Sequence, residues 1–134
     1  MAALNEIRGM TDEVLAKLRD YGIKDSDDLL ESAKTAVGRK ELASKLRIDP
    51  KLLLELANRA DLIRIKGVAG VFSDLLENAG VDTVKELANR VPENLHAKLE
   101  EINGSMKLSQ RTPTLDMVKD WVDQAKKLPK TLEY

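Results

Sequence analysis

The chain has 134 residues, of which 43% are hydrophobic and 34% charged, and its 22 basic and 23 acidic side chains leave a formal net charge of −1. This length suits one domain, or two small halves that share a core. A protein that binds nucleic acid chiefly through phosphates would carry a basic excess, so the charge balance argues against that class. The absence of cysteine excludes disulfides and thiolate metal sites.

Two further features bear on location. No apolar run approaches the length that crosses a membrane, and the first residues, MAALNEIRG, lack the basic start and apolar stretch of a secretory signal. We therefore expect a cytoplasmic protein without a membrane partner.

Four helices are predicted within residues 1–61. Thr11 is a cap for the first, which ends at Gly22, a residue suited to a left-handed turn. The second begins after Asp25 or Ser26. Gly38 is expected to break the chain before a third helix in RKELASKL. The fourth begins at Pro50, which suits a first helical position.

The second half, residues 62–134, repeats this order. Glycine at 80 ends its first helix, Asp82 or Thr83 opens the second, Pro92 opens the third and Thr114 caps the last. A polar segment at 101–113, with Gly104 and Pro113, interrupts the correspondence and is read as an insert. No alternating strand pattern occurs. The predicted fold is all-α, with two pseudo-repeated helical units, 1–61 and 62–134, sharing one core.

The repeat itself is visible at a spacing of 58 residues. Corresponding positions carry the same or similar residues: Leu4 and Leu62, Gly9 and Gly67, Leu18 and Leu76, Gly22 and Gly80, Ile23 and Val81, Leu29 and Leu87. Each copy therefore has a glycine turn, a helix, a second glycine turn and another helix, which resembles a helix–hairpin–helix motif. With the segments NRADLIRIKGV, FSDLLENAGVDTVKELA and ENLHAKL, nearly the whole chain resembles an uncharacterised family of tandem helix–hairpin–helix proteins of unknown function.

The resemblance implies a tandem-hairpin fold and no particular activity. Many helix–hairpin–helix proteins bind DNA without sequence preference, because backbone N–H groups of the glycine turn hold a phosphate. This chain departs from the usual Gly-hydrophobic-Gly pattern, and acidic residues follow the first turn. The candidate nucleic-acid-binding residues are Arg8, Gly9, Thr11, Arg64, Lys66, Gly67 and Ala69.

Other residues suggest weaker sites. The stretch with Arg39, Lys40, Lys45 and Arg47 is the densest in basic residues and is interpreted mainly as a solvated helix face. The aromatic residues Tyr21 and Phe72 fall on predicted core stripes, and Trp121 is expected to be buried against the other half. His96, the single histidine, has no further nitrogen or sulfur ligands at useful spacing, so no metal or cofactor is expected.

These patterns favour a non-catalytic interaction module that binds another protein, whose identity and oligomeric state the sequence leaves open. The alternative is weak, sequence-independent nucleic-acid binding through the helix–hairpin–helix turns. An enzyme is the least favoured reading, because no nucleophile, base and oxyanion group occur in a recognisable pattern.

Overall fold

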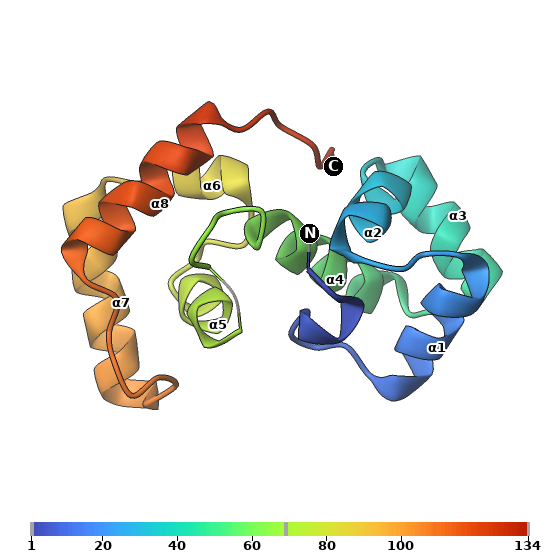
Figure 1. Cartoon of the computed structure of the whole chain (residues 1–134), viewed down its shortest axis with the longest axis horizontal. Helices are drawn as coiled ribbons and strands as arrows, with labels where there is room; N and C mark the ends of the chain where they lie inside the picture. The colour runs from blue at the N-terminus through green and yellow to red at the C-terminus, as the bar shows by residue number, and fades with distance from the viewer. Residues whose placement is uncertain (1, 69, 134) are drawn as a thin grey trace. The chain divides into compact units, whose positions relative to one another are not determined.

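The computed structural model describes residues 2–68 and 70–133. Within this part of the chain the fold is all-α, as predicted, and no strand is present (Figure 1). One short 3-10 helix, η1 (Leu4–Glu6), precedes the α-helices. These are α1 (Asp12–Tyr21), α2 (Ser26–Ala33), α3 (Ala36–Leu46), α4 (Pro50–Leu62), α5 (Val71–Asn78), α6 (Val84–Ala88), α7 (Pro92–Met106) and α8 (Leu115–Lys127).

The helices group into two compact units. Unit 1 contains the residues up to Asp61 together with the tail from Thr131, and unit 2 contains Leu62–Lys130. The tail therefore packs with unit 1, although the sequence analysis placed it at the end of the second unit. Leu132 of the tail is buried, and the Glu133 N–H donates to the Lys34 carbonyl at 2.7 Å.

The predicted helix signals of unit 1 are largely confirmed. The Thr11 hydroxyl accepts a hydrogen bond from the Val14 N–H at the start of α1, and Asp25 accepts one from the Asp28 N–H at the start of α2. Gly22 ends α1 with φ at +102°, a left-handed conformation that costs glycine little. These local interactions satisfy backbone groups that a helix end leaves unpaired.

The break expected at Gly38 is wrong. This glycine lies in the first turn of α3, where its N–H donates to the capping Thr35 hydroxyl at 2.9 Å. A Cβ atom at this position would lie 2.9 Å from that hydroxyl oxygen and 3.1 Å from the Ser32 carbonyl oxygen. Glycine is present because α3 begins close against the end of α2, with which it packs.

Arg39 fastens the end of α2 to the tail. It is only 9% exposed, and its guanidinium donates to the carbonyls of Ala33 at 2.9 Å, Lys34 at 3.3 Å and Glu133 at 2.6 Å. A cation is favourable there, because the carbonyl end of a helix carries partial negative charge. The sequence predicts that Arg39 lies on a solvated basic face, and this prediction is wrong because Arg39 is buried.

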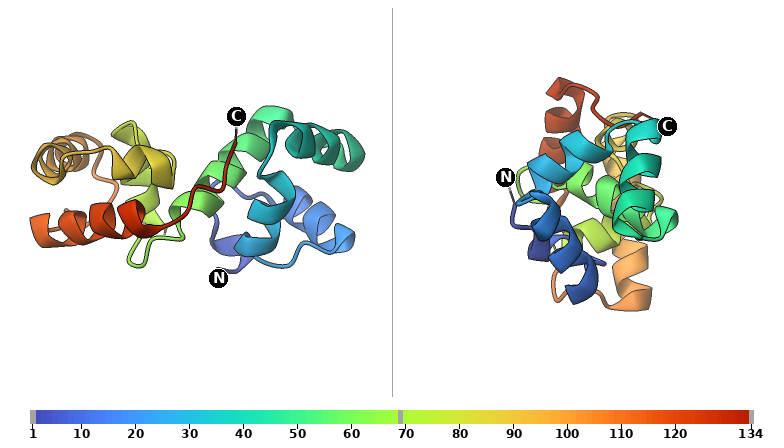
Figure 2. Two further views of the ribbon diagram at one scale, coloured as in Figure 1. Left: turned by 90° about the horizontal axis from the view of Figure 1, so that it is seen from above. Right: turned by 90° about the vertical axis from the view of Figure 1, so that its right-hand side faces the viewer.

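Unit 2 has a core in which α8 packs against α6 and α7, and α5 packs against α7 (Figure 2). Trp121 of α8 is 2% exposed, and its ring lies 5.6 Å from that of Phe72, centroid to centroid, at an interplanar angle of 51°. Tilted aromatic pairs of this kind are favourable beyond the area that they bury. Trp121 is thus buried by groups of its own unit, and Phe72 is only partly buried.

The segment 101–113, which the sequence predicts to be an insert, begins in a helix and ends in a loop. Helix α7 extends through its first six residues to Met106, and Lys107 closes the helix with φ at +52°. The buried Asn103 side chain then organises the loop: its Nδ2 donates to the Ser109 carbonyl at 3.0 Å and to the Thr112 hydroxyl at 3.2 Å, and its Oδ1 accepts from the Ser109 N–H at 2.9 Å.

The same backbone hydrogen bonds occur within each unit, at positions that are 58 residues apart in the sequence. The pairs are Ile7 N–H to Leu4 O and Ile65 N–H to Leu62 O, Met10 N–H to Ile7 O and Val68 N–H to Ile65 O, and Ile23 N–H to Leu18 O and Val81 N–H to Leu76 O. Glycine has positive φ at both ends of each copy, +91° and +102° in the first and +96° and +89° in the second. This agreement is consistent with the pseudo-repeat.

Candidate functional site

The first glycine turn precedes α1. Gly9 is exposed with φ at +91°, and Arg8 beside it is also exposed. The Thr11 hydroxyl caps the helix by accepting from the Val14 N–H at 3.2 Å. Asp12 and Glu13 follow in the first helical turn and are exposed, so they complement the helix dipole with negative charge. A phosphate approaching this helix start would meet two carboxylates.

The second glycine turn is bound to α8 of the same unit. The Lys66 N–H donates to Gln124 Oε1 at 2.8 Å, and Gln124 Nε2 donates back to the Lys66 carbonyl at 3.1 Å. Arg64 donates to the Pro129 carbonyl at 2.9 Å. The Lys66 backbone and the Arg64 guanidinium are thus engaged within unit 2, and a phosphate would have to compete for the Lys66 N–H and for Arg64.

Gly67 has a packing role as well as a backbone role. It is exposed with φ at +96°, and a Cβ atom built on it would lie 3.0 Å from Trp121 Nε1. The turn therefore approaches the indole too closely for an ordinary side chain. Ala69, the remaining candidate in this turn, lies outside the described residues. The predicted site residues fall in two groups, Arg8, Gly9 and Thr11 in unit 1 and Arg64, Lys66 and Gly67 in unit 2.

Sequence reasoning missed Gln124, which pairs with both backbone groups of Lys66. A carboxamide has one acceptor oxygen and two donor hydrogens, so it matches a peptide group in both directions. Nothing local marks position 124 for this role, because its partner lies 58 residues earlier in the chain.

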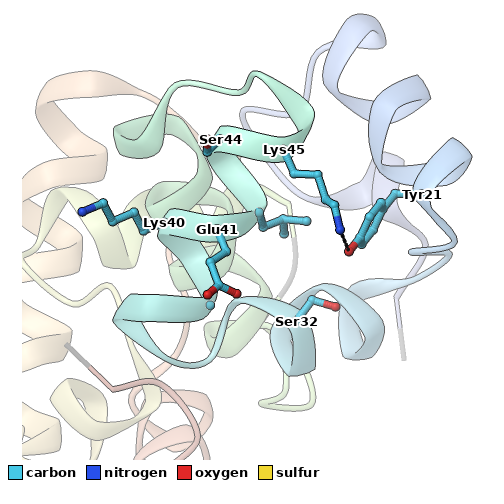
Figure 3. A pocket seen from close by; sticks show the side chains of 8 residues that line it. Tyr21, Ser32, Lys40, Glu41, Ser44 and Lys45 are labelled. Carbon is cyan, nitrogen blue, oxygen red and sulfur yellow. Dashed lines mark hydrogen bonds between the residues drawn. The ribbon is translucent and has the colours of Figure 1, made fainter.

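A groove of about 700 Å³ lies in unit 1 and was not anticipated (Figure 3). It is lined by residues from the end of α1, from α2 and from most of the length of α3: Tyr21, Ser32, Gly38, Lys40, Glu41, Leu42, Ser44 and Lys45. We call it the α1–α3 groove. Its walls combine apolar surface with two lysines and one carboxylate, a composition suited to recognising a peptide or another amphipathic surface.

Tyr21 is the aromatic residue of the groove. It is 47% exposed, so its predicted place on a core stripe is wrong. Tyr21 is the last residue of α1, directly before the turn at Gly22. The buried residues of α1 lie before this position. The Lys45 ammonium donates to the Tyr21 hydroxyl at 3.5 Å and lies 5.3 Å from the ring centroid. The ammonium therefore lies over the ring on its hydroxyl side, at cation–π distance.

The single histidine, His96, does not line the α1–α3 groove. His96 Nε2 lies 3.1 Å from Glu100 Oε1, one helical turn along α7, and this pair spans the helix surface. Among residues 2–68 and 70–133, no group of three or more His, Cys, Asp or Glu side chains could hold a metal ion. None of the helices described in the two units is long and apolar enough to cross a membrane.

Comparison with protein-family models assigns most of the chain. The model described as a domain of unknown function, DUF4332, matches residues 8–128. The chain therefore belongs to this family. Comparison with the curated proteins gives no match, and comparison with the solved structures gives none either.

Proposed function

We propose that this member of the DUF4332 family is a non-catalytic helical interaction module that binds another protein through the α1–α3 groove. The observation that carries the proposal is the tyrosine at its edge, 47% exposed beside a groove of about 700 Å³. Tyrosine offers a large contact area, a polar hydroxyl and few rotatable bonds, so exposed tyrosines are frequent anchors of protein interfaces.

The surroundings of Tyr21 support the same reading. Val37 is 67% exposed and lies one helical turn before Glu41 of the groove. An apolar side chain at this exposure gains free energy when a partner covers it. Lys45 and Glu41 supply opposite charges beside these apolar groups, and such rim charges give an interface its orientation. The proposal includes a cytoplasmic location, which is supported by a sequence without cysteine.

The test is affinity purification from an extract of the source cells after nuclease treatment, with captured proteins identified by mass spectrometry. We expect a protein that is retained by the wild type and lost with Tyr21→Ala. The matched control is Met106→Ala, which removes a 50% exposed apolar side chain in unit 2 and should retain the same protein. If Tyr21→Ala, shown by circular dichroism to be folded, retains every captured protein, the groove is not the binding surface.

A second candidate function rests on the glycine turns. We infer that the two copies related by 58 residues are helix–hairpin–helix motifs, which is supported by their matching hydrogen bonds and glycine conformations. One observation favours phosphate binding: α5 begins at Gly70 without a side-chain cap, unlike α1 with its Thr11. Amide groups at such a helix start attract anions.

Fluorescence anisotropy with labelled duplex and single-stranded DNA tests this candidate at about 50 and 150 mM salt. Lys66→Glu is the informative variant, because residue 66 is exposed and its substitution leaves the backbone bonds to Gln124 available. A substitution of Gly67 would disturb packing against Trp121 and confuse the result. Binding that weakens steeply with salt and is lost in Lys66→Glu would establish the nucleic-acid function.

A further inference from the structure

Unit 2 contains a small pocket between α6 and the end of α8, which we call the α6–α8 pocket. Its volume is about 310 Å³, at the lower end of ligand pockets. The apolar part is formed by Val84, Ala88, Ala125 and Leu128. Three exposed lysines also line it: Lys85 from α6, and Lys126 and Lys130 from the end of α8 and the segment after it.

The charge of this pocket is not neutralised locally. No carboxylate is among its lining residues, and across residues 2–68 and 70–133 none of its three lysines forms an ion pair. The nearby charged groups are turned to other partners: Lys127 pairs with Asp123 at 3.0 Å, and Glu86 pairs with Arg90 at 3.2 Å. In a chain with a net charge of −1, three cations around one apolar depression form a local positive patch.

We propose that the α6–α8 pocket binds an acidic segment of a partner protein, with one apolar side chain inserted between the lysines and carboxylates on either side of it. The pocket of about 310 Å³ has room for an apolar side chain, and its apolar wall gains free energy only from an apolar group. Lysine stems lie along such a side chain while their ammonium groups reach the flanking carboxylates. This site is separate from the α1–α3 groove and adds a second contact to the proposed protein-binding function.

The same features argue against a phosphate backbone as the occupant. A phosphate gains nothing from Val84 or Leu128 and would be partly desolvated against them. Arginine, which binds phosphate through two parallel hydrogen bonds, is absent from the lining. No aromatic side chain lines the pocket to stack on a base.

The experiment uses the whole chain and a fluorescein-labelled decapeptide of aspartate and glutamate with one central leucine. Anisotropy is measured at about 50 mM salt, where a charged interface is least screened. The pocket variant is Lys85→Glu with Lys126→Glu and Lys130→Glu. The matched control is Lys24→Glu with Lys51→Glu and Lys119→Glu, which makes the same change in net charge at exposed lysines outside the pocket.

We expect the pocket variant to weaken peptide binding by at least about tenfold and the control by less than about threefold, because exposed charges outside a contact contribute little. A peptide with serine in place of leucine should also bind more weakly to the wild type. Equal loss in both triple variants would overturn the proposal, as would the absence of peptide binding to the wild type. Tighter binding of a single-stranded DNA of equal charge would also overturn it and assign the pocket to nucleic acid. Since these probes do not involve Tyr21, a failure here is distinguishable from a failure of the groove.

Discussion

Alanine substitutions at Gly22 and Gly67 distinguish the backbone strain of a left-handed turn from the packing of the turn against a neighbouring side chain. Gly22 and Gly67 have similar φ, +102° and +96°, so alanine at either position is forced into a left-handed conformation. A non-glycine residue there costs about 1–2 kcal/mol. A Cβ at Gly22 would meet nothing within 4 Å, whereas one at Gly67 would lie 3.0 Å from Trp121 Nε1.

The second contact predicts an additional cost at Gly67. Moving the indole from its rotamer, or shifting the turn, costs about 0.5–1.5 kcal/mol more. We therefore expect Gly22→Ala to lower the free energy of unfolding by about 1–2 kcal/mol and Gly67→Ala by about 1.5–3.5 kcal/mol.

Urea denaturation followed by far-UV circular dichroism measures both values. Near-UV circular dichroism adds a direct probe, because Trp121 is the only tryptophan: its signal should change in Gly67→Ala and stay unchanged in Gly22→Ala. If the two variants lose equal stability and neither alters the tryptophan signal, the close approach of Gly67 to Trp121 is refuted. If neither loses stability, the left-handed turns are refuted as well.

The other predictions concern the elements that hold each unit together. Asn103→Ala should lower the free energy of unfolding by about 1–3 kcal/mol, because three hydrogen bonds that order the loop after α7 are lost. As a control on the same helix, substitution of the exposed Asn94 by alanine should cost less than about 0.5 kcal/mol in the same urea titration. Arg39→Ala should lower the free energy of unfolding by about 2–4 kcal/mol, because carbonyls at the end of α2 and in the tail lose their donor. It should also speed hydrogen exchange of the tail amides. Arg39→Lys should recover only part of the lost stability, because one ammonium cannot replace the guanidinium fork. The helical glycines should respond with opposite signs in thermal unfolding. Gly104→Ala should stabilise by about 0.5–1 kcal/mol, because its Cβ would meet nothing within 4 Å. Gly38→Ala should destabilise, because its Cβ would lie 2.9 Å from the Thr35 hydroxyl oxygen and 3.1 Å from the Ser32 carbonyl oxygen.

Local signals in the sequence predict the helices well. Capping residues such as Thr11 and Thr114 accept hydrogen bonds within their own first turn, and Pro92 stands at the start of α7. Such interactions are complete within four or five residues, so a pattern of sequence contains them. The all-α fold follows from these signals and from the helical spacing of the apolar residues.

The errors arise where contacts between distant segments decide the structure. The sequence predicts a break at Gly38, yet this residue lies inside α3, where the Thr35 hydroxyl and the Ser32 carbonyl leave little space for a side chain. Residues 101–106, the first part of the predicted insert, extend α7, and the sequence does not show that Asn103 draws the following loop against that helix. Composition alone does not reveal either approach, since a polar segment with a glycine is equally typical of loops.

The candidate site follows the same rule. The glycines of the turns were found from the repeat, and their positive φ values agree with the role assigned to them. The engagement of Lys66 by Gln124 was missed, because the two residues are joined only by the fold. The sequence contains one weak indication that Tyr21 is exposed, namely its position as the last helical residue before Gly22. Helical periodicity alone places it on the core face instead.

Site-specific photo-cross-linking at position 21 tests the central claim most directly. A benzophenone amino acid is placed at position 21 or, as a control, at position 106, both of which are about half exposed in the wild type. Each protein is irradiated in extract of the source cells, with and without nuclease treatment. We expect a discrete protein adduct at position 21 that is absent at position 106 and is unaffected by nuclease. Adducts of equal yield at both positions, or an adduct that disappears with nuclease, would contradict a protein-binding groove beside α1.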